Sequence, residues 1–167
     1  MRFLLTIAAL VCTGCGSSAP EDSDGVGDTD VQTPEPGFGT LAASFGIDSD
    51  WRDNMDEPAT GPFWGSVYNA DEVSAIGPDE GAEALANLYV ASVDLTGDLS
   101  TAVLVTTEEL PEGWVTILGF MDSDGNAIVD DEDPDSKDPV TLPGQNEFEV
   151  IRDVESEVEI FFGLLNP

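Results

Sequence analysis

The amino-acid sequence predicts an all-β protein, an antiparallel β-sandwich of about seven short strands. Two observations carry this prediction. Apolar side chains alternate with small or polar ones along most of the chain after Phe38, which is the period of a half-buried strand. Short clusters rich in Gly, Pro and Asp separate these alternating runs and are typical of turns.

The strands are expected in a regular succession. They cover residues 41–47, 63–68, 89–95, 103–105, 113–121, 147–152 and 158–164. Along 63–68, Trp64, Ser66 and Tyr68 share one face. Residues 113–121 are apolar on both faces, which suits a central strand. The Ala-rich residues 79–88 are the one helical competitor and are expected to form a turn or two at most.

The segment LPEGWVTI at residues 110–117 resembles a motif of the transthyretin-like, carboxypeptidase-regulatory-like sandwiches. In those domains a Leu-Pro-x-Gly turn leads into a core strand that begins aromatic-x-apolar. The resemblance implies the sandwich fold. It implies no activity, because such domains are usually structural or binding accessories.

The N-terminal segment has the pattern of an export signal. Arg2 precedes an apolar run from Phe3 to Val11, which is too short to span a bilayer of ~30 Å. Thr13, Gly14 and Cys15 follow, and the segment resembles the signal peptide and lipobox of bacterial lipoproteins. Cys12 stands where that family prefers Leu. The alternative is an ordinary secretory signal.

The lipoprotein resemblance implies that residues 1–14 are removed and that Cys15 carries a lipid anchor. It also implies the cell envelope, and the outer membrane in particular, because Gly16 stands where an inner-membrane retention signal would have Asp. Residues 15–37 are acidic and poor in apolar side chains, so a disordered linker is expected there. The folded domain is expected over residues 38–167.

Composition excludes several classes of function. The formal net charge is −31, which repels nucleic acid and attracts cations. Adaptation of a solvated surface to high salt would explain the same acidity. The chain has no His, and it has no Cys after Cys15, so His-based and Cys-based catalysis are excluded.

The stretch Asp122–Asp133 resembles the calcium loop of an EF-hand without its flanking helices. Calcium takes 6–8 oxygen ligands, which alternating Asp and Asn side chains supply. The residues at ligand positions are Asp122, Asp124, Asn126, Ile128 through its carbonyl, Asp130 and Asp133. Gly125 comes two positions early, because Ala127 stands where the EF-hand loop has its glycine. The alternative is a solvated acidic loop.

Two further groups of residues have less specific patterns. A second acidic cluster, Asp48 to Glu57, is expected to be a solvated turn. Trp51, Trp64, Tyr68 and Trp114 are expected mainly in the core. A sugar-binding face is the alternative.

These observations together predict a lipid-anchored envelope protein with a non-catalytic, calcium-binding structural or adhesion module. Its expected partners are the membrane, through the lipid, and divalent cations, but not nucleic acid. The alternatives are a carbohydrate-binding accessory and a small carboxylate-dependent hydrolase.

Overall fold

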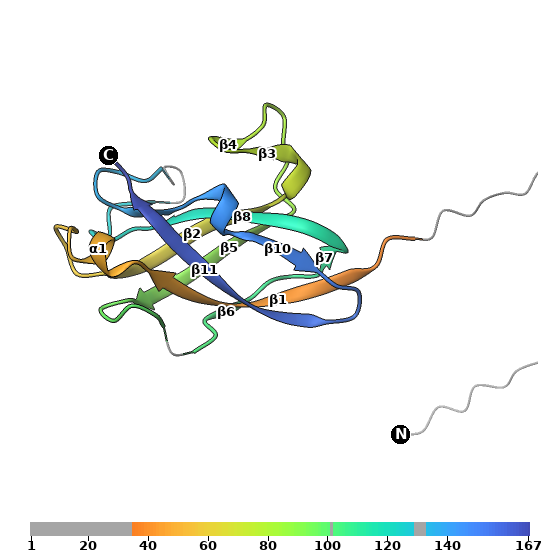
Figure 1. Ribbon diagram of the computed structural model, residues 1–167, viewed down its shortest axis with the longest axis horizontal. Helices are drawn as coiled ribbons and strands as arrows, with labels where there is room; N and C mark the ends of the chain where they lie inside the picture. Colours follow the sequence, from red (N-terminus) through yellow and green to blue (C-terminus); the bar gives the residue numbers. More distant parts are fainter. Residues whose placement is uncertain (1–34, 101, 129–132) are drawn as a thin grey trace, which may run out of the picture. The chain divides into compact units, whose positions relative to one another are not determined.

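A computed structural model describes residues 35–100, 102–128 and 133–167 of the chain (Figure 1). The predicted signal peptide, Cys15 and most of the predicted linker lie outside the described residues, as does Asp130. The described part forms one compact unit. None of its helices is long and apolar enough to cross a membrane.

Strands dominate the described chain, and the all-β prediction is confirmed. They are β1 (Phe38–Ile47), β2 (Thr60–Asn69), β3 (Val73–Ser74), β4 (Gly77–Pro78), β5 (Ala86–Asp94), β6 (Val105–Thr106), β7 (Leu110–Pro111), β8 (Gly113–Met121), β9 (Pro139–Thr141), β10 (Glu147–Val150) and β11 (Glu155–Leu165). The helical segments are α1 (Ser49–Arg52) and the 3₁₀ turns η1 (Ala70–Glu72) and η2 (Pro143–Gln145). Residues 79–85 form turns and loop and no helix, within the turn or two at most that the sequence led us to expect there.

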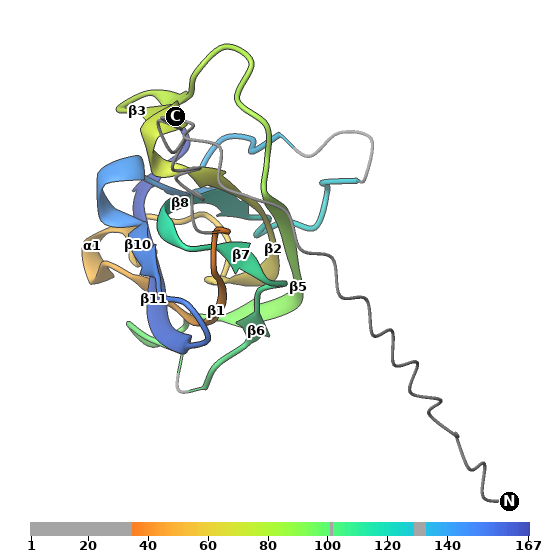
Figure 2. The same ribbon diagram turned by 90° about the vertical axis from the view of Figure 1, so that its right-hand side faces the viewer.

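Nine strands form one mixed sheet, in the order β5-β2-β8-β9-β11-β1-β6, with β10 paired to β8 and β7 paired to β1. The sheet wraps round on itself and brings its two edge strands, β5 and β6, into contact (Figure 2). The pair β1–β11 is parallel, whereas the other pairings in the described chain are antiparallel. Because β1 and β11 lie at opposite ends of the domain sequence, no tight hairpin fixes their relative direction.

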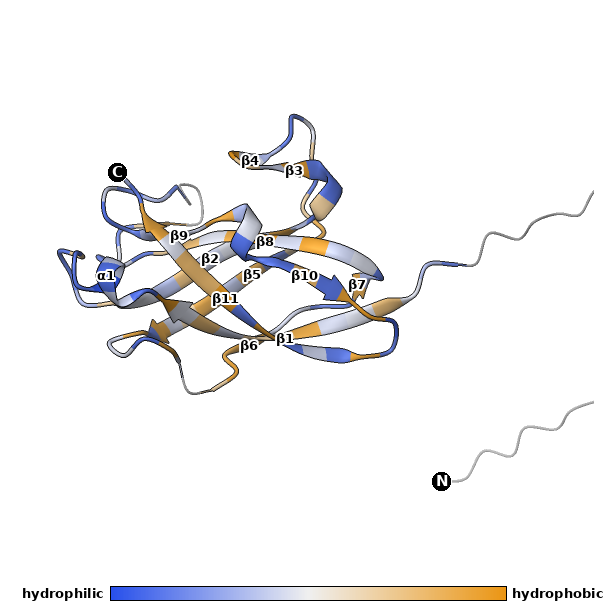
Figure 3. Ribbon diagram, viewed as in Figure 1, coloured by the Kyte–Doolittle hydropathy of each residue, from blue (hydrophilic) through white to orange (hydrophobic). Residues whose placement is uncertain are grey.

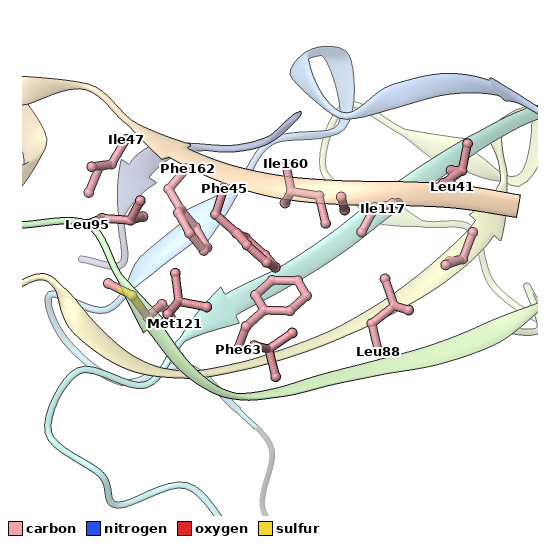
Figure 4. Close-up of a cluster of buried hydrophobic side chains, with 14 of the residues drawn as sticks. Leu41, Phe45, Ile47, Phe63, Leu88, Leu95, Ile117, Met121, Ile160 and Phe162 are labelled. Carbon is pink, nitrogen blue, oxygen red and sulfur yellow. The ribbon is translucent and has the colours of Figure 1, made fainter. Parts of the chain in front are cut away.

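Three phenylalanine rings form the centre of the core (Figure 4). Phe45 lies 4.8 Å from Phe63 and 6.0 Å from Phe162, measured between ring centroids. Gly65 and Gly119, paired on β2 and β8, leave room for the Phe63 ring. A Cβ atom on Gly119 would lie 2.7 Å from the ring of Phe63 and 2.3 Å from the Trp64 carbonyl oxygen.

A buried asparagine fixes the loop between β9 and β10 to the closing strand. The Asn146 side chain is fully buried. Its Oδ1 accepts from the Phe161 N–H at 2.7 Å, and its Nδ2 donates to the carbonyls of Phe161 and Leu142 at 2.9 and 3.0 Å. Its amide group thus satisfies backbone groups that the strand ladder does not pair.

The chain enters the domain at one end of β1 and forms its acidic loops at the other end. The segment after β1 carries α1, and the loop after β8 lies at this same end of the sheet (Figure 1). Both segments are markedly hydrophilic (Figure 3). The register of β2 with β8, in which Phe63 pairs with Met121, places the start of one strand beside the end of the other.

Candidate cation site

Asp122, the first residue after β8, organises the acidic loop from within. It is 1% exposed. Its Oδ1 accepts from the N–H groups of Gly125 and Asn126 at 2.8 and 3.1 Å, and its Oδ2 accepts from the Ala127 N–H at 3.1 Å. Three charge-assisted hydrogen bonds therefore close the loop around one carboxylate.

The loop turns at Gly125, whose φ of 76° lies in the left-handed region that favours glycine. An EF-hand loop has its sharp turn two residues later, at the position of Ala127. The early turn explains why Gly125 departs from that spacing. In this loop the backbone N–H groups that follow the turn point to the first aspartate, Asp122, and the turn comes earlier than in an EF-hand loop.

Asp138 closes the second half of the loop and is also buried. Its Oδ1 accepts from the N–H and the Oγ of Ser123 at 3.0 and 2.9 Å, and its Oδ2 accepts from the Asp135 N–H at 3.3 Å. Burial raises the pKa of Asp138, and the repulsion of Asp135 adds to this effect. The hydrogen bonds from Ser123 and Asp135 oppose the rise but do not cancel it.

Asp124 and Asp135 are exposed and share one amide partner. The Nδ2 of Asn126 donates to Asp124 at 2.9 Å and to Asp135. A second bond runs from the Asn126 N–H to Oδ1 of Asp124 at 3.1 Å. Two carboxylates from separate parts of the loop are thus held beside the same side chain.

These two carboxylates face the second acidic segment across a small polar hollow. The hollow has a volume of about 170 Å³ and is lined by Asp56, Glu57, Ser123, Asp124, Asp135, Ser136 and Lys137. Asp56 and Glu57 were expected to be part of a solvated turn. In the structure they belong to the same hollow as the loop after β8.

A lysine ammonium group lies in this hollow. The Nζ of Lys137 is 3.3 Å from Oδ1 of Asp56 and 3.3 Å from the Asn54 carbonyl oxygen. Lys137 is the one lysine of the chain, and its φ of 77° is unusual for a residue other than glycine. The hollow thus already holds one cationic group, and four carboxylates line it.

The rest of the second acidic segment is satisfied locally. Asp48 caps α1 and accepts from the Asp50 N–H at 2.8 Å. Arg52 pairs with Asp98 and, at 3.5 Å, with Asp53. These residues form the solvated turn that was expected for this segment.

The residues predicted as ligands are divided between different places. Asp122 is buried and occupied by backbone donors, and Asp124 lines the hollow. Asn126 does not line it but donates to Asp124 and Asp135, which do, and Ile128 is 61% exposed. Asp133 lines a different hollow, beside Trp64. Asp130 lies outside the described residues.

The donor set fits a hard divalent cation. The oxygen ligands that line the hollow are carboxylates and hydroxyls, which Ca²⁺ and Mg²⁺ prefer. Within the described ranges, no three acidic side chains are arranged as a ready-made metal group. Binding would therefore have to draw the carboxylates of Asp56, Asp124 and Asp135 closer together.

The sequence pattern alone could not associate Asp56 and Glu57 with the loop. They lie more than sixty residues from Asp124 in the chain, and the pairing of β2 with β8 brings them together. The one available signal was charge, since both segments are acidic and each sits at the end of a predicted strand.

The tryptophans and Tyr68 are not in the core, contrary to expectation. Trp51 and Trp114 are exposed, and Trp64 and Tyr68 are half-buried on the outer face of β2. The buried aromatic rings of the core are phenylalanines. This leaves an aromatic surface on the outside of the sheet.

Comparison of the chain with protein-family models, with curated proteins and with solved structures gives no significant match.

Proposed function

We propose that this protein is a non-catalytic, calcium-binding module that a lipid on Cys15 attaches to the bacterial cell envelope. The observation that carries the calcium proposal is the hollow at one end of the sheet. Four carboxylates from two distant segments line it, and the amino group of Lys137 pairs with one of them, Asp56. Carboxylates that line one small hollow repel one another, so a divalent cation that drew them together would stabilise the fold.

The position of the hollow suits a module held at a surface. The chain enters the domain at one end of β1, and the segment after α1 and the loop after β8, which line the hollow, lie at the other end (Figure 1). A cation bound there would link the loop after β8 to the segment after α1. In an anchored protein this end would be available to a partner.

The test is calorimetric titration of the protein with calcium and with magnesium. We expect one calcium to bind, and the double substitution Asp124→Asn and Asp135→Asn to abolish the heat. Asp50→Asn and Asp53→Asn together remove the same charge from the neighbouring segment and should leave binding in place. Equal loss in both double variants would contradict a site at the hollow.

The anchor is tested separately. The lipobox resemblance predicts that Cys15→Ala gives a protein that no longer sediments with membranes. A wild-type protein that carries no lipid mass would contradict the anchor and would leave the calcium proposal standing.

A further inference from the structure

A groove on the outer face of the sheet lies apart from the acidic hollow. Its volume is about 370 Å³, and its lining comes from β2, β4, β8, β9 and the segment before β9. Trp64 and Tyr68 contribute aromatic side chains, Pro78 and Pro134 contribute rigid apolar ones, and Asp133 contributes a carboxylate. An aromatic and apolar groove with a few polar groups is the usual composition of a small-ligand site.

A row of apolar side chains runs across the strands at this groove. Register places Tyr89, Trp64, Phe120 and Val140 side by side on β5, β2, β8 and β9. The Trp64 and Tyr89 rings contact each other, with centroids 4.5 Å apart. Since neighbouring strands are ~4.8 Å apart, the row is roughly 14 Å long. Phe120 within it is buried, so Trp64 at the groove and the exposed Tyr89 beside it are the rings on which sugar units could lie.

One polar atom in this row lacks a partner. The Nε1 of Trp64 is buried and donates to no acceptor in the part of the chain that the structure describes. A buried donor without an acceptor costs about 1–3 kcal/mol, so an oxygen that reached it would be bound favourably. Because the atom is covered, the indole has to turn toward the groove to meet such an oxygen.

The groove also offers acceptors. Ser66 lines the groove, and its Oγ donates to Oδ1 of Asn87 at 2.9 Å, so its lone pairs can still accept from a ligand. The exposed carboxylate of Asp133 accepts as well. A ligand that satisfies this surface must both donate and accept hydrogen bonds.

Charge and topology argue against the other classes of ligand that could occupy this groove. The net charge of −31 and Asp133 repel anionic ligands. Both edges of β2 and of β8 are already paired, so an added peptide strand finds no free backbone here. A proline-rich peptide would offer carbonyl acceptors to Trp64 but no N–H to Ser66 or Asp133.

We infer that this groove binds a neutral oligosaccharide. The apolar faces of its sugar rings would lie on Trp64 and along the row to Tyr89. Its hydroxyl groups would accept from the indole N–H and donate to Ser66 and Asp133. This inference does not depend on calcium at the acidic hollow, and the two sites can fail independently.

The test uses the full chain with three neutral hexasaccharides as probes, cellohexaose, maltohexaose and chitohexaose. The indole N–H signals of the three tryptophans are followed by NMR, and the signal absent in Trp64→Phe identifies Trp64. We expect millimolar concentrations of at least one probe to shift this signal in a saturable way, and to leave the signal of Trp51 unchanged.

Trp64→Phe keeps an aromatic ring and removes the donor, so it should weaken binding about fivefold, as the loss of one hydrogen bond does. Trp64→Ala should abolish binding, and Trp51→Phe is the matched control. If Trp64→Ala unfolds the domain, the binding measured for Trp64→Phe decides the test. The inference is overturned if no probe shifts the Trp64 signal, if Trp64→Phe binds as well as wild type, or if polygalacturonate or hexaproline binds more tightly.

Discussion

The Nζ of Lys137 lies 3.3 Å from Oδ1 of Asp56, although 81 residues separate them in the chain. This contact joins the segment that precedes β2 to the loop that follows β8. It places a positive charge among carboxylates that would otherwise repel one another. The same place is where the proposed cation would bind, so Lys137 and the cation should compete.

Replacing Lys137 with Gln should therefore raise calcium affinity. Removing one unit charge a few ångströms from the cation is worth about 1 kcal/mol, which corresponds to roughly a threefold to tenfold lower Kd. Calorimetric titration measures it. Arg152→Gln is the matched control, since it removes the same charge beside Glu112, near the start of β1. Equal effects of both substitutions would mean that calcium responds only to overall charge.

Asn146 should be among the most sensitive polar positions in the domain. In Asn146→Ala, the Phe161 N–H and two carbonyls lose their partner inside the protein, which should cost about 2–4 kcal/mol of unfolding free energy. Urea denaturation measures this. Asn87→Ala removes an exposed amide with one side-chain partner and should cost less than about 1 kcal/mol. Similar losses in the two variants would contradict the role given to Asn146.

Gly119 should not tolerate a side chain. In Gly119→Ala the new Cβ would approach the Trp64 carbonyl and the Phe63 ring, so β2 and β8 must separate. We expect a loss of about 1–3 kcal/mol, as in other overpacked cores. Gly97→Ala adds the same methyl group where no atom lies within 4 Å and should be nearly neutral. Thermal melting of the two variants makes the comparison.

The raised pKa of Asp138 predicts a pH dependence of the metal-free protein. A group whose pKa is higher in the folded state binds its proton more tightly there than in the unfolded chain. Its charge therefore destabilises the fold above the folded pKa, and this cost disappears as the pH falls through that value. In chelator, the melting temperature should therefore rise as the pH falls from the folded pKa of Asp138 toward its ordinary value of 3.8.

Asp138→Asn should show a smaller rise over the same pH range, because it lacks the titrating group. Asp53→Asn, which removes an exposed carboxylate, should behave like wild type. If both variants keep the full rise, the pH dependence comes from the general acidity of the surface and not from Asp138.

How well the sequence predicts a strand depends on the length of that strand. In β2 the period of two correctly separates Phe63 and Val67 from Trp64 and Tyr68, but it does not show which face is buried, and the expectation that Trp64 lies in the core is wrong. β6, β7 and β9 have two or three residues each, too few to show a period. The parallel pair β1–β11 is set by contacts between distant segments, which no local pattern encodes.

The candidate site shows the same limit. The density of acidic residues after β8 points to that loop, and Asp124 lines the hollow. Asp133 fits the twelfth position of a calcium loop by spacing, yet it lines the groove of Trp64. After the turn at Gly125, spacing along the chain no longer determines in which direction a side chain points. The contribution of Asp56 and Glu57 depends instead on the register of β2 with β8.

The most direct test of the central claim compares melting in calcium and in sodium chloride at matched ionic strength. A site filled to 100 times its Kd stabilises the fold by ~2.7 kcal/mol. Calcium should therefore raise the melting temperature of wild type well above the sodium chloride value. Asp124→Asn, which retains an acceptor for the Asn126 N–H, should lose most of that gain, whereas Asp53→Asn should keep it. If sodium chloride stabilises as much as calcium, or if the two variants respond alike, the hollow is not a calcium site and its carboxylates are only part of an acidic surface.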